Sequence, residues 1–278
     1  MAATVLVLAV AVVVTLDARV QEAASPPAPA GVPRTTGGGA VTLEAHDPAL
    51  GAALLRLAGS RTAKHLDAVG DRYYDLGIRD KALEYYLEAL RRDRTSVGAL
   101  DGAARIYRDW GQLTHALGNA HRATYFAPRS AAAWNTLGTI LQALDLQSDA
   151  AHAYRFALSL DRTAVYARSN LCYLALTTGD SNTALDECRA ALAVDEAFTP
   201  ARNNLGLLFA VAGDRGRAAE TFRAATGEAA GHYNTGLVLL AQQDYAAAIL
   251  AFEAAYRADP QLAPAHRFAR AARRALRQ

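Results

Sequence analysis

The stretch "ARNNLGLLFAVAGDRGRAAETFRAAT", residues 201–226, contains two apolar segments separated by Gly213 and Asp214. Apolar residues recur at helical spacing in both segments, so the stretch predicts two helices joined by a short turn. Gly206 lies inside the first predicted helix, where glycine is less favourable than alanine by about 1 kcal/mol. A close crossing of the two helices, with the ring of Phe222 filling the remaining space, would account for this glycine.

The same two-helix pattern recurs along most of the chain. Small residues open the second helix every 34 residues, at Ala82, Ala116, Ala150, Ala184 and Ala218, and a parallel series follows at Ala89, Ala123, Ala157, Ala191 and Ala225. Between the two series lie Tyr86, Ala120, Tyr154, Cys188 and Phe222. The sixth unit, with Ala248, Phe252 and Ala255, follows the fifth after only 30 residues, which places a four-residue deletion near residues 226–230.

The first helix of each unit carries an apolar residue followed by a small one. These pairs are Val69-Gly70, Ala103-Ala104, Leu137-Gly138, Leu171-Cys172, Leu205-Gly206 and, as a weaker match, Thr235-Gly236. The turns carry Gly77, Gly111, Gly179 and Gly213, each suited to a helix end that needs a left-handed residue. This period, together with "AAAWNTLGTILQAL" at residues 131–144, resembles the tetratricopeptide repeat.

The resemblance implies an all-α fold, a right-handed α-solenoid of about six tetratricopeptide (helix-turn-helix) repeats with end-capping helices. The expected organisation is an apolar signal-like or anchor segment at 1–23, a Pro/Gly/Ala-rich linker at 24–46, an N-terminal capping helix at 47–62, six repeats over 63–262 and a basic C-terminal capping helix at 263–278. The repeats are expected at 63–96, 97–130, 131–164, 165–198, 199–228 and 229–262.

The N-terminal region bears on the compartment. Residues 1–16, "MAATVLVLAVAVVVTL", contain no charge, and their apolar run is shorter than the roughly 20 residues of a membrane-spanning helix. Such a length favours the core of a secretory signal, or a membrane tether through residues 2–16, although no basic residue precedes the run. We therefore expect an exported protein, periplasmic or secreted, or an N-terminally anchored one, with a cytoplasmic chain as the alternative.

The composition and motifs indicate no catalytic, metal or cofactor site. The seven histidines include no pair at metal-ligand spacing, and Gly37-Gly38-Gly39 is not followed by the lysine of a phosphate loop. A net charge of +2 gives no reason to expect a nucleic-acid partner. We expect no enzyme and no cofactor.

The two cysteines, Cys172 and Cys188, fall at packing positions of the two helices of the fourth unit. They are interpreted as small core residues, and in an exported protein they would have the alternative of forming a disulfide. A count of free thiols in unreduced protein distinguishes these states.

Asparagines give the candidate binding site. Asn170, Asn204 and Asn234 share one register in three successive units, and Asn135 and Asn203 lie one residue away from it. In the resembling family this side of the first helix lines a concave groove, where a carboxamide can donate to and accept from the backbone of an extended peptide. Tyr166, Tyr173 and Tyr233 are expected to contribute to the same partner-binding surface.

Two function classes follow from the resemblance. The first is a non-catalytic scaffold that binds an extended peptide or partner protein in its groove, in a bacterial envelope assembly such as pilus or secretion machinery. The alternative is a structural protein that self-assembles into homo-oligomers. The sequence leaves the oligomeric state open, and light scattering across concentrations distinguishes the two classes.

Overall fold

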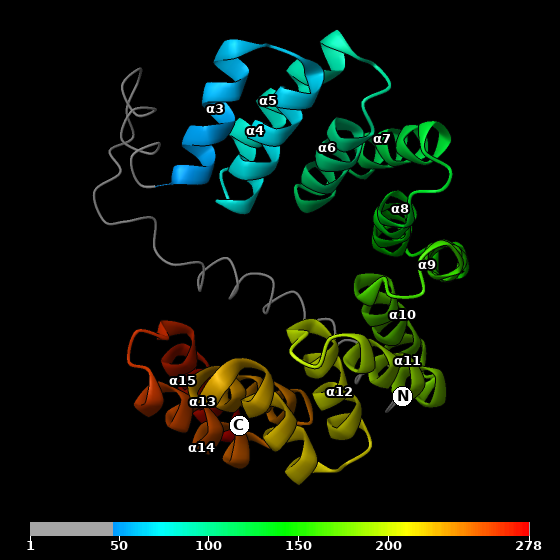
Figure 1. Ribbon diagram of the computed structural model, residues 1–278. Coiled ribbons are helices and arrows are strands. Elements are labelled where there is room, and N and C mark those ends of the chain that lie inside the picture. The colour runs from blue at the N-terminus through cyan, green and yellow to red at the C-terminus, as the bar shows by residue number, and fades with distance from the viewer. Residues whose placement is uncertain (1–46, 278) are drawn as a thin grey trace. The chain divides into compact units, whose positions relative to one another are not determined.

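The computed structural model describes residues 47–277, which form two compact units, 47–162 and 163–277. The apolar segment predicted at 1–23 and the linker predicted at 24–46 lie outside the described residues. Within the described range, thirteen α-helices and no strands are found, and the predicted all-α helical-repeat class is confirmed. Each unit is built from antiparallel helical hairpins (Figure 1).

The unit 47–162 contains one preceding helix and three hairpins. Its helices are α3 (Pro48–Gly59), α4 (Ala63–Asp75), α5 (Arg79–Arg92), α6 (Val97–Asp109), α7 (Leu113–Phe126), α8 (Ala131–Ala143) and α9 (Gln147–Leu160). The hairpins are α4/α5, α6/α7 and α8/α9, and the first helices of successive hairpins also contact each other. Helix α3 starts after Asp47, whose carboxylate accepts from the amides of Ala49 and Leu50 and pairs with Arg72 at 2.8 Å.

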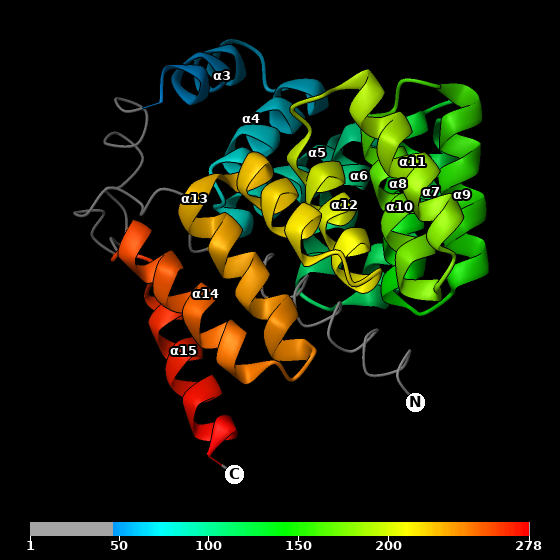
Figure 2. The same ribbon diagram turned by 90° about the horizontal axis from the view of Figure 1, so that it is seen from below.

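The unit 163–277 has the same construction. Its helices are α10 (Val165–Thr178), α11 (Ser181–Val194), α12 (Thr199–Val211), α13 (Arg215–Ala241), α14 (Tyr245–Ala258) and α15 (Ala263–Leu276). Figure 2 shows α13, α14 and α15 lying side by side. Helix α15 packs Ala265, Ala269 and Ala272 against the unit, and Phe268 stacks on Phe252 with ring centroids 5.5 Å apart.

The shortened fifth unit produces a kink instead of a loop. Helix α13 is continuous from Arg215 to Ala241 except at Gly227, which has φ 83° and ψ −179°. Only glycine adopts this conformation readily. Beyond the kink, the backbones come so close that a Cβ added to Gly231 would lie 2.6 Å from Arg223 Cα. The predicted deletion therefore joins the second helix of one repeat to the first helix of the next.

The turn at the end of each first helix is left-handed, as the glycine spacing predicts. Gly77, Gly111, Gly179 and Gly213 have φ between 72° and 85°. Where the series lacks a glycine, Asp145 and Gln243 take the same conformation with φ of 60° and 61°. The amide of the residue after each left-handed residue donates to a carbonyl five residues earlier, as Ile78 does to Tyr73 at 2.9 Å.

The two helices of each hairpin cross at a fixed pair of residues, named here the crossing pair. The pairs are Gly70–Tyr86, Ala104–Ala120, Gly138–Tyr154, Cys172–Cys188, Gly206–Phe222 and Gly236–Phe252. The explanation offered for Gly206 is confirmed, because a Cβ there would lie 2.6 Å from Phe222 Cε1. The rings of these pairs are buried, and their burial outweighs the helix penalty of the glycine.

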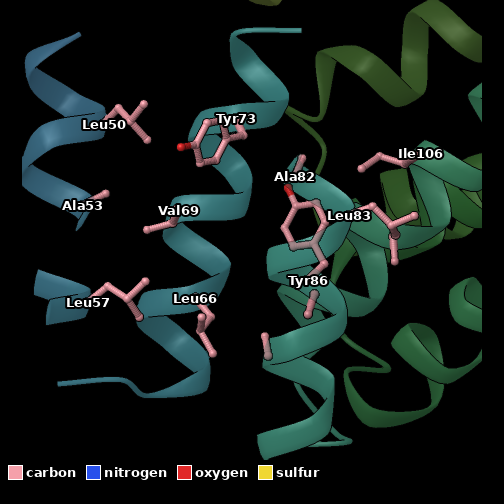
Figure 3. Packing of buried hydrophobic residues seen from close by; sticks show 13 residues of the cluster. Leu50, Ala53, Leu57, Leu66, Val69, Tyr73, Ala82, Leu83, Tyr86 and Ile106 are labelled. Carbon is pink, nitrogen blue, oxygen red and sulfur yellow. The ribbon is translucent and has the colours of Figure 1, made fainter. Parts of the chain in front are cut away.

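A continuous core connects helices α3 to α6 (Figure 3). Leu50, Ala53 and Leu57 of α3 face Leu66 and Val69 of α4. On the other side of α4, the ring of Tyr86 fills the space between its own hairpin and the next. The apolar face of α3 thus covers the first hairpin.

Candidate partner-binding faces

Charged residues of the 47–162 unit gather on its first helices at one repeated register. The residues Asp67, Asp71 and Tyr74 on α4 correspond, 34 residues later, to Asp101, Arg105 and Arg108 on α6. Spacings of four and three residues place each set on one helix face. With Asp109 at the end of α6, these residues form what we call the charged face.

Arg105 organises the centre of the charged face. Its Nε lies 3.2 Å from Asp101 Oδ2, and its guanidinium lies 4.4 Å from the centroid of the Tyr74 ring. Arg79 approaches the same ring at 5.6 Å and pairs with Asp109 at 3.3 Å. Cation–π contacts and ion pairs hold these side chains in defined positions.

Two buried tyrosine hydroxyls donate to polar side chains of the first helices, and one of these side chains belongs to the charged face. The hydroxyl of Tyr86 donates to Asp71 at 2.7 Å, and the hydroxyl of Tyr154 donates to Gln142 at 2.8 Å. Burial raises the pKa of both phenols, so they remain neutral donors at ordinary pH. These bonds are not foreseen by the sequence analysis. Their signal is a tyrosine in place of phenylalanine at the crossing pair, because a buried phenol needs a partner.

Two carboxyls of the charged face are partly withdrawn from water. Burial raises the pKa of Asp67, an effect that the hydrogen bond from Ser96 Oγ at 2.5 Å opposes. Burial also raises the pKa of Asp101, against the opposing charge of Arg105. By contrast, hydrogen bonds from Thr95 lower the pKa of Asp93.

We expect Asp67 to titrate above the ordinary aspartate value of 3.8, and Asp93 below it, in a carboxyl-detected NMR titration. The folded-state pKa of Asp67 exceeds its unfolded value. The contribution of Asp67 to the stability of the fold is therefore full below the unfolded pKa, and it is lost as pH rises through the folded pKa. Ser96→Ala should raise the Asp67 midpoint further. A midpoint for Asp67 at or below that of Asp93 would contradict this assignment.

The candidate asparagines occupy different environments. In the 163–277 unit Asn170 and Asn204 are half-buried, whereas Asn203 and Asn234 are 7% and 4% exposed. Asn204 Nδ2 donates to the Ser169 carbonyl at 3.1 Å, tying α12 to α10. In the other unit Asn135 is half-buried on α8. Three of the five carboxamides are thus partly exposed, and two are buried.

The three candidate tyrosines also differ in how far they are buried. Tyr166 is 64% exposed at the start of α10, where its ring meets Phe198 edge-on at 5.1 Å. Tyr173 is half-buried, and burial raises the pKa of its phenol. Tyr233 is fully buried against Phe252 and Phe268, so its ring belongs to the core.

We expect opposite effects from alanine at the adjacent residues Asn203 and Asn204. The buried carboxamide of Asn203 has no hydrogen-bond partner within the described residues, so Asn203→Ala should leave stability unchanged or raise it. Asn204→Ala removes two bonds to Ser169 and should lower the free energy of unfolding by about 1 kcal/mol. Urea melts of both variants measure this. Equal losses in the two variants would contradict the distinction.

Cys172 and Cys188 form a disulfide, with their Cα atoms 5.3 Å apart. Of the two alternatives left open by the sequence, the structure therefore shows the bonded one. The bond occupies the crossing pair of the fourth hairpin, where four of the other hairpins place a glycine against an aromatic ring. It joins α10 to α11 covalently at the point where their neighbours are joined by packing.

The described residues contain no group of three or more histidine, cysteine or acidic side chains arranged to hold a metal ion. None of the helices in the same range combines the length and the apolar character of a membrane-spanning segment.

Stacked helical hairpins with a repeated crossing pair define the class of the molecule, an all-α helical-repeat protein. The model of the tetratricopeptide repeat family matches residues 229–262. The match assigns residues 229–262 to the tetratricopeptide repeat family, and the other hairpins of the described residues have the same two-helix construction. Members of this class are in general non-catalytic scaffolds for protein–protein interaction.

Solved structures of similar fold share low sequence identity with the chain. The APC/C hetero-tetramer Cut9-Hcn1 contains a chain 18% identical, with a TM-score of 0.68, over 80% of this chain and 45% of that one. A tetratricopeptide repeat protein from Parabacteroides merdae ATCC 43184 is 16% identical, with a TM-score of 0.61, over 80% of this chain and 90% of that one.

The type IV pilus biogenesis factor PilW is 21% identical, with a TM-score of 0.60, over 72% of this chain and 94% of that one. At these identities the likeness shows the fold. The chain spans less than half of the Cut9-Hcn1 chain that it matches. No curated protein matches the sequence.

Proposed function

We propose that the protein is a non-catalytic scaffold that holds an extended peptide or a partner protein on its first helices, along the concave groove predicted for such repeats. The further part of the proposal is a setting in a bacterial envelope assembly, such as pilus or secretion machinery.

The charged face is the observation that carries the binding role. Most of its residues are half-buried and held by neighbours, as Arg105 is by Asp101 and Tyr74. A surface whose long side chains are already ordered loses less conformational entropy when a partner binds. Arg108 of this face is held by Thr139 on α8 at 2.8 Å, and Asn135 on α8 takes the register of Asp67 and Asp101. Together they offer a partner both charges and carboxamides.

The disulfide supports the envelope setting. Disulfides persist in the periplasm and in secreted proteins and are rare in the cytosol of mesophiles. The uncharged apolar run at residues 2–16 agrees with export or with a membrane tether. PilW, a protein of similar fold, is a pilus biogenesis factor, which agrees with the same setting.

A crosslinked pull-down from the native cell tests the binding role. Wild type is compared with Arg108→Ala plus Asn135→Ala, and with a control, His152→Ala plus Arg155→Ala, on the exposed surface of α9. All three proteins must first show the same thermal melt. A partner captured by wild type and the control, and lost by the first variant, supports the proposal. A partner retained by all three would move the binding surface away from the first helices.

A further inference from the structure

A pocket lies on the second helices of the first two hairpins, away from the charged face of the first helices. Its cavity of about 580 Å³ is lined by Leu87, Leu90, Arg91, Arg94, Asn119 and Arg122. The first four belong to α5 and the turn after it, and the last two to α7. The volume falls in the range of functional binding pockets.

The lining of the pocket is cationic. Three guanidinium groups line it, and none of them forms an ion pair within the part of the chain that the structure describes. The nearby carboxylate of Glu88 is occupied by Arg61 at 2.7 Å and by Arg92 at 3.2 Å. The lining itself contains no carboxylate.

Helix stability does not account for this arrangement. Basic residues in the last turn of a helix interact favourably with its dipole, which explains Arg91 on α5. Arg122 lies before the last turn of α7, and Arg94 lies beyond the end of α5. The side chain of Arg122 donates to the carbonyl of Arg94 at 2.7 Å, which holds it in the lining of the pocket.

Apolar surface lies inside and beside this basic lining. Leu87 and Leu90 are partly buried and supply apolar surface within the pocket. On α7, Phe126 follows Asn119 and Arg122 at helical spacing and is therefore on their side of the helix. Phe126 is 41% exposed and its neighbour Tyr125 is 78% exposed. Exposed aromatic and arginine side chains around an apolar centre are typical of the energetic centres of protein interfaces.

We propose that this pocket binds an acidic segment of a partner protein. One apolar side chain of the segment lies on Leu87 and Leu90, and its flanking carboxylates pair with Arg91, Arg94 and Arg122. Charge complementarity selects this occupant, since the lining offers three cations and no anion. The site is separate from the first-helix faces, so it does not depend on the function proposed above.

A library of random peptides displayed on phage, selected against the full chain, tests this inference. We expect enriched peptides to carry Asp or Glu on both sides of an apolar residue. The affinity of a labelled synthetic copy, measured by fluorescence anisotropy, should weaken about tenfold or more in Arg91→Ala plus Arg122→Ala. It should also weaken as ionic strength rises.

The matched control is Arg267→Ala plus Arg270→Ala, which removes the same charge from the exposed surface of α15. Affinity unchanged in this control assigns binding to the pocket. Peptides without acidic residues, or equal affinity in wild type and both variants, would overturn the proposal.

Vesicles of phosphatidylglycerol and phosphatidylcholine are tested in parallel. The proposal would also be overturned if no acidic peptide were enriched and the vesicles bound wild type and the control but not the pocket variant. That result would assign the pocket to a lipid surface.

Discussion

Removing the disulfide by Cys172→Ala plus Cys188→Ala is expected to lower the free energy of unfolding of the 163–277 unit by about 3 kcal/mol. The bond closes a loop with a sequence separation of 16, and its loss enlarges the conformational freedom of the unfolded chain. The sulfurs are also fully buried, so their removal leaves unfilled space at the crossing of α10 and α11. Denaturant melts of oxidised wild type and variant measure the difference.

A second variant separates the covalent contribution from the packing contribution. Cys172→Gly plus Cys188→Phe gives the fourth hairpin the same crossing pair as Gly206–Phe222 in the fifth. We expect it to be more stable than the double alanine variant, because the ring fills the crossing. A thiol assay on unreduced wild type should find no free thiol. Two reactive thiols, together with a double alanine variant as stable as wild type, would refute the structural role of the bond.

Gly102→Ala is expected to destabilise the 47–162 unit by about 1 to 3 kcal/mol or more, through overpacking. A Cβ at this position would lie 2.3 Å from Tyr86 Cζ. The ring cannot move away from α6, because its other side lies against the backbone of α4 at Gly70. A Cβ built at Gly70 would lie 2.7 Å from the same ring. Any displacement of Tyr86 would also break the bond from its hydroxyl to Asp71. Thermal and urea melts measure the loss.

Gly118→Ala is the matched control for this substitution. Gly118 lies inside α7, and a Cβ there has no atom within 4 Å. The same change should therefore raise stability by about 0.4 to 1 kcal/mol, through the helix preference of alanine. If both alanine variants were stabilised, the close crossing at Tyr86 would not exist in solution.

The helical hairpins and their crossings follow from the sequence because both depend on local spacing. A small residue and a ring in fixed register, as in Gly206 and Phe222, recur often enough to identify which helix meets which. The sequence leaves the bonding state of Cys172 and Cys188 open for a physical reason. It depends on the compartment as well as on geometry, and spacing reports neither.

The candidate site was less predictable because helical registers are sensitive to a shift of one residue. Successive residues on a helix differ by about 100° around its axis. Asn203 therefore points into the core while Asn204 reaches Ser169 on the neighbouring helix. Tyr233 illustrates a second reason. Helix α15 and its Phe268 cover a face that the repeat register alone leaves open.

The position of the disulfide has a consequence for how the chain folds. Its two cysteines lie in one hairpin and are the only cysteines of the protein, so just one intramolecular pairing exists. The two cysteines are also close in the sequence, and contacts between residues that are close in the sequence form quickly during folding. Oxidation can then follow hairpin formation directly, without the slow reshuffling that multiple pairings impose. If the chain enters an oxidising compartment unfolded, the disulfide would fix the pairing of α10 with α11, and the neighbouring hairpins would then pack on this one.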